Sequence, residues 1–169
     1  MVTFSEAIQT LTDKNKSNIG IGQYIGRQLK IQDDHMSSDS NPSIIPPTVL
    51  VIDDDASVCH MLTVLLEDQK YYVFSASNGH AAVEILKELD VDLVVTDIIM
   101  PGMEGIELIR NIKKTSPKIK IIAMSGYRAS GQLDYLRYAR EFGVDHTFQK
   151  PFDVLQFLQT VKELIPQGA

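Results

Sequence analysis

Acids, a hydroxyl and an amine occur in this sequence directly after short apolar runs. Asp53 and Asp54 end the run VLVIDD, and Asp97 ends LVVTD. Ser125 ends IIAMS, and Lys150 stands just before a proline in HTFQKP. Buried parallel strands have the composition of such runs, and their carboxyl ends meet at one edge of a sheet. These five side chains are therefore predicted to face one crevice.

Three acids in one crevice require a cation. Two unit charges about 4 Å apart repel by roughly 4 kcal/mol at an effective dielectric near 20. Oxygen ligands suit a hard divalent ion, and we favour magnesium that holds the carboxylates together with a phosphoryl group. One carboxylate could then attack phosphorus and form an acyl phosphate. Lys150 would neutralise the transferred group, and the Ser125 hydroxyl would hydrogen-bond one of its oxygens.

The elements that must position these groups follow one another regularly from Thr48 onward. Runs of strand length alternate with helical periodicity, which predicts an α/β fold, a doubly wound parallel (βα)5 sheet. The predicted strands are 48–53, 71–76, 92–97, 119–124 and 145–149, and the predicted helices are 56–69, 79–89, 105–115, 130–142 and 153–165. Asp55 and Asn78 are placed to cap the first two helices, and Gly143 to end the fourth.

Residues 1–47 have a different composition. They are polar and close in SSDSNPSIIPP, which is typical of an extended linker. Thr3 and Glu6 have the spacing of a capping box, so a short helix is expected there, and 23–32 is a weaker helix candidate. We expect a weakly structured N-terminal extension and linker at 1–47 and a folded domain at 48–166. The extension is either a passive leader or a docking or oligomerisation arm.

The net charge of -6 argues against a direct nucleic-acid partner, because phosphate binding requires a basic face. No apolar run approaches the roughly 18 residues of a membrane span. The N-terminus lacks the basic and then apolar profile of a signal peptide. We therefore expect a cytoplasmic protein.

Taken together, the motifs resemble the receiver domain of two-component response regulators. The resemblance covers residues 48–165, and the combined motif is highly specific. It implies the flavodoxin-like strand order 2-1-3-4-5. The matching positions are Asp53-Asp54, Asp97 followed by Met100-Pro101 and Gly105, Ser125-Gly126, and Lys150-Pro151-Phe152.

The resemblance also implies roles for the acids. Asp97 would accept a phosphoryl group from a histidine kinase or a histidine phosphotransfer protein. Asp54 would bind Mg²⁺ directly, and Asp53 would bind it through water or support it as a nearby acid. Asp97 itself and the Ile99 carbonyl would complete the metal ligands.

By the same resemblance, Ser125, Gly126 and Lys150 would contact the phosphoryl group, and the Lys150-Pro151 bond would be cis. Receivers usually carry an aromatic switch residue three positions before this lysine. Here that position is Thr147, so Ser125 and Thr147 are the expected switch residues.

The predicted function is a stand-alone receiver without a C-terminal output domain. Phosphorylation would add about two negative charges and shift the population of the surface around the fourth helix and fifth strand. This surface would bind a downstream protein or a second copy. Ile99 and Tyr127, which flank the site, have no carboxylate or amide to orient water, so a long-lived acyl phosphate is expected.

Three other kinds of protein share part of this pattern. DDDAS at 53–57 partly matches the nucleophile motif of haloacid-dehalogenase-type Mg²⁺-dependent phosphatases, but the following Gly-Thr is absent. A flavodoxin or nucleotide-binding protein would need a Gly/Ser/Thr-rich phosphate loop after the first strand. A degenerate receiver that acts only as a scaffold would not need the complete set of acids, hydroxyl and lysine. We therefore predict a phosphoacceptor and not an enzyme.

Overall fold

The computed structural model describes residues 46–100, 105–126 and 135–167, so nearly all of the predicted extension at 1–47 lies outside the described residues. The described chain forms a five-stranded parallel sheet in the order β2-β1-β3-β4-β5, which confirms the predicted fold. The strands are β1 (Thr48–Ile52), β2 (Tyr72–Ala76), β3 (Leu93–Asp97), β4 (Lys120–Gly126) and β5 (His146–Lys150). The helices are α3 (Ala56–Asp68), α4 (Gly79–Glu88), α5 (Gly105–Thr115), α6 (Tyr135–Glu141) and α7 (Val154–Leu164).

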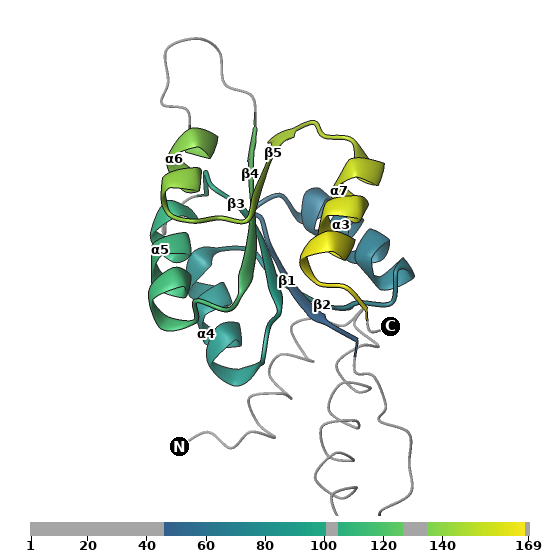
Figure 1. The fold of residues 1–169 in the computed structure, drawn as a ribbon, viewed down its shortest axis with the longest axis horizontal. Coiled ribbons are helices and arrows are strands. Elements are labelled where there is room, and N and C mark those ends of the chain that lie inside the picture. The colour runs from purple at the N-terminus through teal and green to yellow at the C-terminus, as the bar shows by residue number, and fades with distance from the viewer. Residues whose placement is uncertain (1–45, 101–104, 127–134, 168–169) are drawn as a thin grey trace, which may run out of the picture. The chain divides into compact units, whose positions relative to one another are not determined.

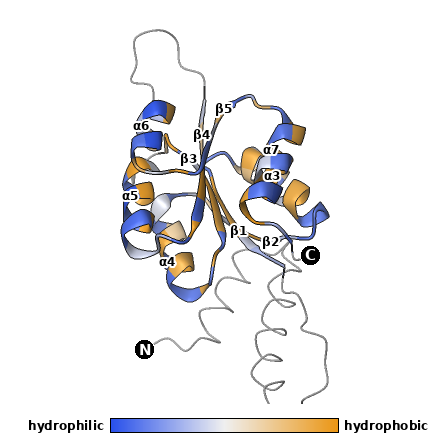
Figure 2. Ribbon diagram, in the orientation of Figure 1, coloured by the Kyte–Doolittle hydropathy of each residue, from blue (hydrophilic) through white to orange (hydrophobic). Residues whose placement is uncertain are grey.

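Helices cover both faces of the sheet. Figure 1 shows α3 and α7 on one face and α4, α5 and α6 on the other. The central strands β1 and β3 are buried along their whole length, and Figure 2 shows their hydrophobic character. Burial on both faces explains why these strands have near-continuous apolar sequences instead of alternating ones. The core beneath α3 and α7 includes Val49, Val51, Leu62, Leu66, Val95, Met124, Phe148, Phe157 and Val161.

The register of the central strands brings their carboxyl ends together. Ile52, the last residue of β1, pairs with Thr96 of β3. The next residues, Asp53 and Asp97, therefore leave neighbouring strands at the same level. Asp97 in turn pairs with Met124 of β4.

Side-chain caps fix where the helices begin. Asp55 accepts a hydrogen bond from the Ser57 N–H at 2.8 Å, and Asn78 accepts one from Ala81 N–H at 2.9 Å. Both caps were predicted from the sequence. They satisfy backbone donors that the first turn of a helix leaves free.

Every predicted strand differs from the structure by one or two residues at one end or both, and two of these differences have an identifiable reason. The Tyr71 N–H bonds to Leu66 O, and Lys70 has φ +66°, so α3 ends in a Schellman turn and β2 begins at Tyr72, not at Tyr71. At the other end of the sheet, β4 continues to Gly126 because Ser125 and Gly126 pair with β5. The predicted helix 130–142 is described from Tyr135 onward, and 130–134 lies outside the described residues. Within the described chain, no helix is long and apolar enough to cross a membrane.

Candidate functional site

Three acids and one lysine converge at the carboxyl end of the sheet. Asp53, Asp54 and Asp97 each offer an oxygen, and these oxygens lie within 4.8 Å of one another. Asp53 follows β1, Asp97 ends β3, and Lys150 ends β5. The structure thus brings together residues that are up to 97 positions apart in the sequence.

Lys150 bridges two of the acids. Its Nζ lies 2.5 Å from Asp53 Oδ2 and 2.5 Å from Asp97 Oδ2. The side chain of Asp53 is 1% exposed, that of Asp97 is 10% exposed, and Asp54 is exposed at the rim. The cluster therefore contains three carboxylates and one ammonium, which leaves it with an excess of negative charge.

Backbone donors hold the second oxygen of each buried acid. The Asp55 N–H donates to Asp53 Oδ1 at 3.0 Å, and the Ile99 N–H donates to Asp97 Oδ1 at 2.8 Å. Burial raises the pKa of Asp53 even though Lys150 and the Asp55 N–H act in the opposite direction. Burial alone would lower the pKa of Lys150, but its hydrogen bonds to Asp53 and Asp97 outweigh burial and leave that pKa raised.

A hard divalent cation fits this set of donors. The three side chains offer only oxygen ligands, which Mg²⁺ prefers. One oxygen from each side chain lies within 4.8 Å of the other two, so a single ion could bind all three. The net negative charge that Lys150 leaves uncompensated favours such an ion. Asp54 faces solvent and so leaves the cluster open to a ligand from outside.

Comparison with known proteins decides which family has this arrangement. Residues 49–162 match the response regulator receiver domain. The chain belongs to this family. Sporulation initiation phosphotransferase F of Bacillus subtilis is 33% identical over 118 residues, which cover 70% of this chain and 93% of that protein. The chemotaxis protein CheY of Halobacterium salinarum is 32% identical over 117 residues, 69% of this chain and 95% of that one.

Solved structures agree with the family match. The response regulator TrrA of Thermotoga maritima, solved in complex with Mg(2+)-BeF, is 28% identical with a TM-score of 0.61, over 70% of this chain and 98% of that one. A receiver domain protein from Clostridium thermocellum is 29% identical with a TM-score of 0.64, over 70% and 94% of the two chains. This receiver therefore functions in phosphoacceptor signalling.

The backbone around Asp97 is fixed by close packing against the start of α5. The Gly105 N–H donates to Ile98 O at 3.0 Å, and the Thr96 hydroxyl donates to Asp97 O at 2.9 Å. A Cβ on Gly105 would collide with the Asp97 carbonyl oxygen and with Ile98 Cα. Only glycine therefore lets α5 begin this close to the end of β3.

The predicted phosphoryl-contacting residues lie on β4 and β5. Ser125 is buried, and its hydroxyl lies 3.4 Å from the Gly126 carbonyl oxygen. Gly126 pairs with Lys150 on β5. The Lys150-Pro151 bond is cis, as predicted. Tyr127, the predicted shield of the phosphoryl group, lies outside the described residues.

Thr147 is not among the groups that meet Lys150. Its hydroxyl accepts hydrogen bonds from Arg140 of α6, from Nε at 3.1 Å and from Nη2 at 2.8 Å. The sequence analysis did not foresee this pair. A side-chain bond between residues seven positions apart on different elements has no local sequence signature.

A second group of charges, also not foreseen, lies at the amino end of the sheet. Asp145 accepts hydrogen bonds from Lys113 Nζ at 3.1 Å, from Lys120 Nζ at 3.0 Å and from the Ile121 N–H at 2.9 Å. Burial alone would raise the pKa of Asp145, but these three donors outweigh burial and lower it. The group ties α5, β4 and the start of β5 together.

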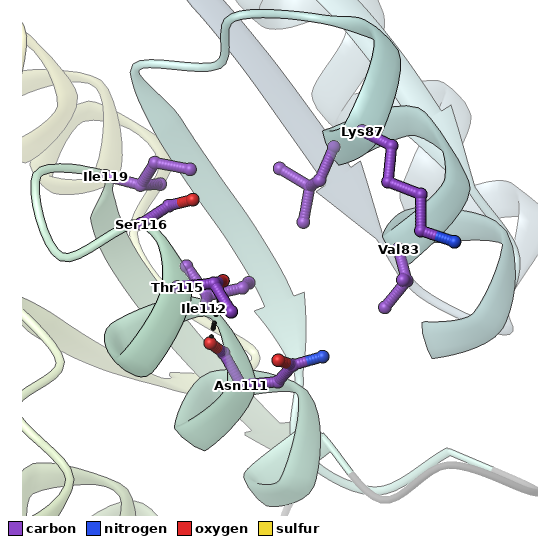
Figure 3. A pocket seen from close by; sticks show the side chains of 8 residues that line it. Val83, Lys87, Asn111, Ile112, Thr115, Ser116 and Ile119 are labelled. Carbon is purple, nitrogen blue, oxygen red and sulfur yellow. Dashed lines mark hydrogen bonds between the residues drawn. The ribbon is translucent and has the colours of Figure 1, made fainter.

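A pocket of about 270 Å³ lies between α4 and α5, also toward the amino end of the sheet (Figure 3). Val83, Leu86, Ile112 and Ile119 give it apolar walls. None of the carboxylates at the opposite end of the sheet lines it. The pocket is therefore separate from the cluster of Asp53, Asp54 and Asp97.

Proposed function

We propose that this receiver is phosphorylated on Asp97 in a Mg²⁺-dependent reaction, with a phosphohistidine of a histidine kinase or histidine phosphotransfer protein as the donor. The observation that carries the proposal is the position of Lys150 Nζ between Asp53 and Asp97 at the carboxyl end of the sheet. An ammonium held there can stabilise the negative charge of a phosphoryl group that is transferred to a neighbouring carboxylate.

Exposure and contacts distinguish Asp97 from the other two acids. Asp53 is almost completely buried, so an incoming donor cannot reach its oxygens. Asp54 is exposed, and no bond to Lys150 is found for it. Asp97 both contacts Lys150 and keeps some exposure, which suits a nucleophile.

Each remaining residue has a role that its position supports. Asp53, Asp54, Asp97 and the Ile99 carbonyl would hold Mg²⁺, which supplies positive charge beside the phosphoryl oxygens when it is bound. An Asp97 oxygen forms a bond to phosphorus while the bond from phosphorus to the donor imidazole nitrogen breaks. Lys150 and the Ser125 hydroxyl then bind phosphoryl oxygens, together with the backbone of Gly126.

The partners follow from this chemistry. Sensor kinase CckA of Brucella abortus is 38% identical over 123 residues, but the match covers only 12% of that protein. Its name, and that of the sporulation phosphotransferase, support a kinase or a phosphotransfer protein as the donor for this chain. We further propose a cytoplasmic location, a protein target or self-association downstream, no direct nucleic-acid contact, and no catalysis beyond phosphotransfer to the receiver and its loss.

The test is to incubate the full chain with a small-molecule phosphodonor and Mg²⁺, and to locate any phosphoryl group by peptide mass spectrometry. We expect one phosphoryl group on Asp97, dependence on Mg²⁺, and complete loss of the label in Asp97→Asn. Asp90→Asn is the matched control, because it removes an exposed acid before the start of β3, away from the cluster, and should keep the label.

Two other results would contradict the proposal. Label on Asp53 would favour the phosphatase alternative, and an unmodified chain would favour a scaffold. The same sample tests the expected lifetime: label lost within seconds in Mg²⁺ buffer would contradict a long-lived acyl phosphate.

A further inference from the structure

A threonine interrupts the apolar run of β3. Leu93, Val94 and Val95 are followed by Thr96, which is 0% exposed, and then by Asp97. Valine has nearly the same shape as threonine, so packing alone does not explain a hydroxyl at this position. Burying a hydroxyl costs free energy unless it makes a hydrogen bond. The Thr96 hydroxyl makes one, to the Asp97 carbonyl oxygen at 2.9 Å, so its role lies in the backbone of Asp97.

The Asp97 carbonyl needs such a donor because β1 has already ended. The last pair between β1 and β3 is Ile52 with Thr96, so Asp97 lies one residue beyond it. The Ile98 N–H donates to Met124 O on β4, and successive residues of a strand bond to alternate neighbours, so the Asp97 carbonyl points to the side of β1. The Thr96 hydroxyl takes the place of the missing strand partner.

Helix α5 closes the space on another side of the same oxygen. A Cβ on Gly105 would lie 2.3 Å from the Asp97 carbonyl oxygen and 2.6 Å from Ile98 Cα. The Gly105 N–H does not serve the Asp97 carbonyl, because it donates to the Ile98 carbonyl at 3.0 Å. In the described chain, Thr96 is therefore the one side-chain donor found for the Asp97 carbonyl.

The peptide unit between Asp97 and Ile98 is thereby held at both ends. Its carbonyl accepts from the Thr96 hydroxyl, and its N–H donates to Met124 O at 2.9 Å. A peptide unit is planar, so two such bonds fix its rotation and the direction in which the chain continues to Ile99. The position of the Ile99 N–H therefore depends on the Thr96 hydroxyl.

The Ile99 N–H in turn orients the Asp97 carboxylate. Asp97 Oδ1 accepts from the Ile99 N–H at 2.8 Å, and Asp97 Oδ2 lies 2.5 Å from Lys150 Nζ. A rotation of the peptide unit that withdraws the Ile99 N–H would free Oδ1, and the carboxylate could then turn away from Lys150. Reacting groups must be held close to their productive geometry, and small displacements cost much of the rate.

We propose that Thr96 is a positioning residue for phosphoryl transfer to Asp97. Its hydroxyl holds the Asp97 carbonyl, which keeps the Ile99 N–H on Oδ1 and so keeps Oδ2 turned toward Lys150. The proposal rests on the phosphorylation of Asp97 proposed above. Thr96 acts through the backbone and does not contact the reacting atoms.

Two substitutions separate the hydroxyl from the shape of the side chain. Thr96→Val keeps the β-branched shape and removes the hydroxyl, whereas Thr96→Ser keeps the hydroxyl and removes the methyl group. Thr160→Val is the matched control, because Thr160 is also a buried threonine whose hydroxyl donates to a backbone carbonyl, that of Gln156, at 2.9 Å. It removes the same kind of bond in α7, which carries none of the predicted site residues.

The first measurement is amide hydrogen exchange, resolved by NMR, of the full chain and its variants in Mg²⁺-free buffer. We expect the Ile99 amide to exchange several-fold faster in Thr96→Val, and at the native rate in Thr96→Ser and Thr160→Val. The Val51 amide of β1 reports global unfolding and should exchange faster in both valine variants. An unchanged Ile99 rate in Thr96→Val would overturn the proposal, and so would an equal rise of that rate in Thr160→Val.

The second measurement is the rate at which a small-molecule phosphodonor with saturating Mg²⁺ labels Asp97, at a temperature where every variant is folded. We expect a roughly tenfold lower rate in Thr96→Val, as the loss of one buried hydrogen bond permits, a rate within about threefold of native in Thr96→Ser, and the native rate in Thr160→Val. A native rate in Thr96→Val, or a loss that Thr96→Ser does not restore, would overturn the proposal.

Failure of the proposed function has a different signature. It would appear as an unlabelled Asp97 in the native chain, whatever residue occupies position 96. The exchange measurement needs no phosphorylation, so the rate at the Ile99 amide would still decide whether Thr96 orients the carboxylate.

Discussion

The two ends of the sheet carry clusters of aspartates and lysines with opposite charge balance: acids are in excess at the carboxyl end and lysines at the amino end. At the carboxyl end, the single ammonium of Lys150 serves the buried carboxylates of Asp53 and Asp97. At the amino end, the single carboxylate of Asp145 is served by Lys113 and Lys120. The pKa of Asp53 is raised by burial, whereas the donors around Asp145 outweigh burial and lower its pKa.

The difference separates a functional cluster from a structural one. Every oxygen of Asp145 has a partner, and these partners come from α5, β4 and the backbone, so the cluster fastens the fold. The acids at the carboxyl end exceed their cations, which destabilises the folded chain unless another cation arrives. Proteins commonly keep such local instability where a ligand has to bind.

The largest expected effect on stability comes from breaking the satisfied cluster. Asp145→Asn keeps the shape of the side chain but removes the charge that both lysines share. We expect the free energy of unfolding to fall by about 2 kcal/mol. This is less than the cost of breaking a fully buried ion pair, because the side chain of Lys120 is nearly half exposed. Urea denaturation in Mg²⁺-free buffer measures it.

Asp90→Asn is the control for this change, since Asp90 is exposed and lies in the turn before β3. It should leave the free energy of unfolding unchanged. If Asp145→Asn were equally neutral, the amino-end cluster would be a surface feature with no structural weight.

A smaller effect of opposite sign is expected at the carboxyl end. Asp53→Asn removes one of the two acids that compete for Lys150 and keeps an oxygen for the Asp55 N–H. In Mg²⁺-free buffer we expect a gain of about 1 kcal/mol in the free energy of unfolding. Adding Mg²⁺ should reduce or reverse this advantage, because the native chain binds the ion better. A destabilised variant without Mg²⁺ would mean that Asp53 is satisfied by Lys150 alone.

The same contrast explains what the sequence could predict. The acids that follow VLVI and LVVT were placed correctly in one crevice, because buried parallel strands have a clear composition and their carboxyl ends share one edge. The strand order and the cis Lys150-Pro151 bond came from the family resemblance and are confirmed. The roles assigned to the individual site residues, from Asp97 as the phosphoacceptor to Ser125, Gly126 and Ile99, stay predictions.

Contacts made by long side chains could not be predicted in this way. Lys113 and Asp145 are 32 positions apart, and many surface lysines have the same local sequence as Lys113. Arg140 finds Thr147 only because α6 packs on β5. The end of α3 was misplaced for a related reason: Lys70 adopts the left-handed conformation that usually signals glycine.

The smallest and most discriminating effect is the pH dependence of the stability changes that Asp145→Asn and Asp53→Asn cause. The folded-state pKa of Asp145 is lowered, so its contribution is present above the unfolded-state pKa of about 4 and is lost as the pH falls through the folded-state value. The folded-state pKa of Asp53 is raised, so its unfavourable ionisation is absent below about pH 4 and grows as the pH rises through the folded-state value.

The stability difference between Asp145→Asn and the native chain should therefore shrink toward zero from a loss as the pH falls below about 4. Asp53→Asn should be more stable than the native chain at neutral pH, and this gain in the free energy of unfolding should shrink toward zero as the pH falls. The gain should disappear at a higher pH than the loss for Asp145→Asn, because the pKa of Asp53 is raised and that of Asp145 is lowered. Denaturation curves between neutral and acid pH without Mg²⁺ compare the two series directly. Two differences of the same sign at neutral pH would show that both clusters fasten the fold, and that the acid excess at the carboxyl end is already compensated by Lys150.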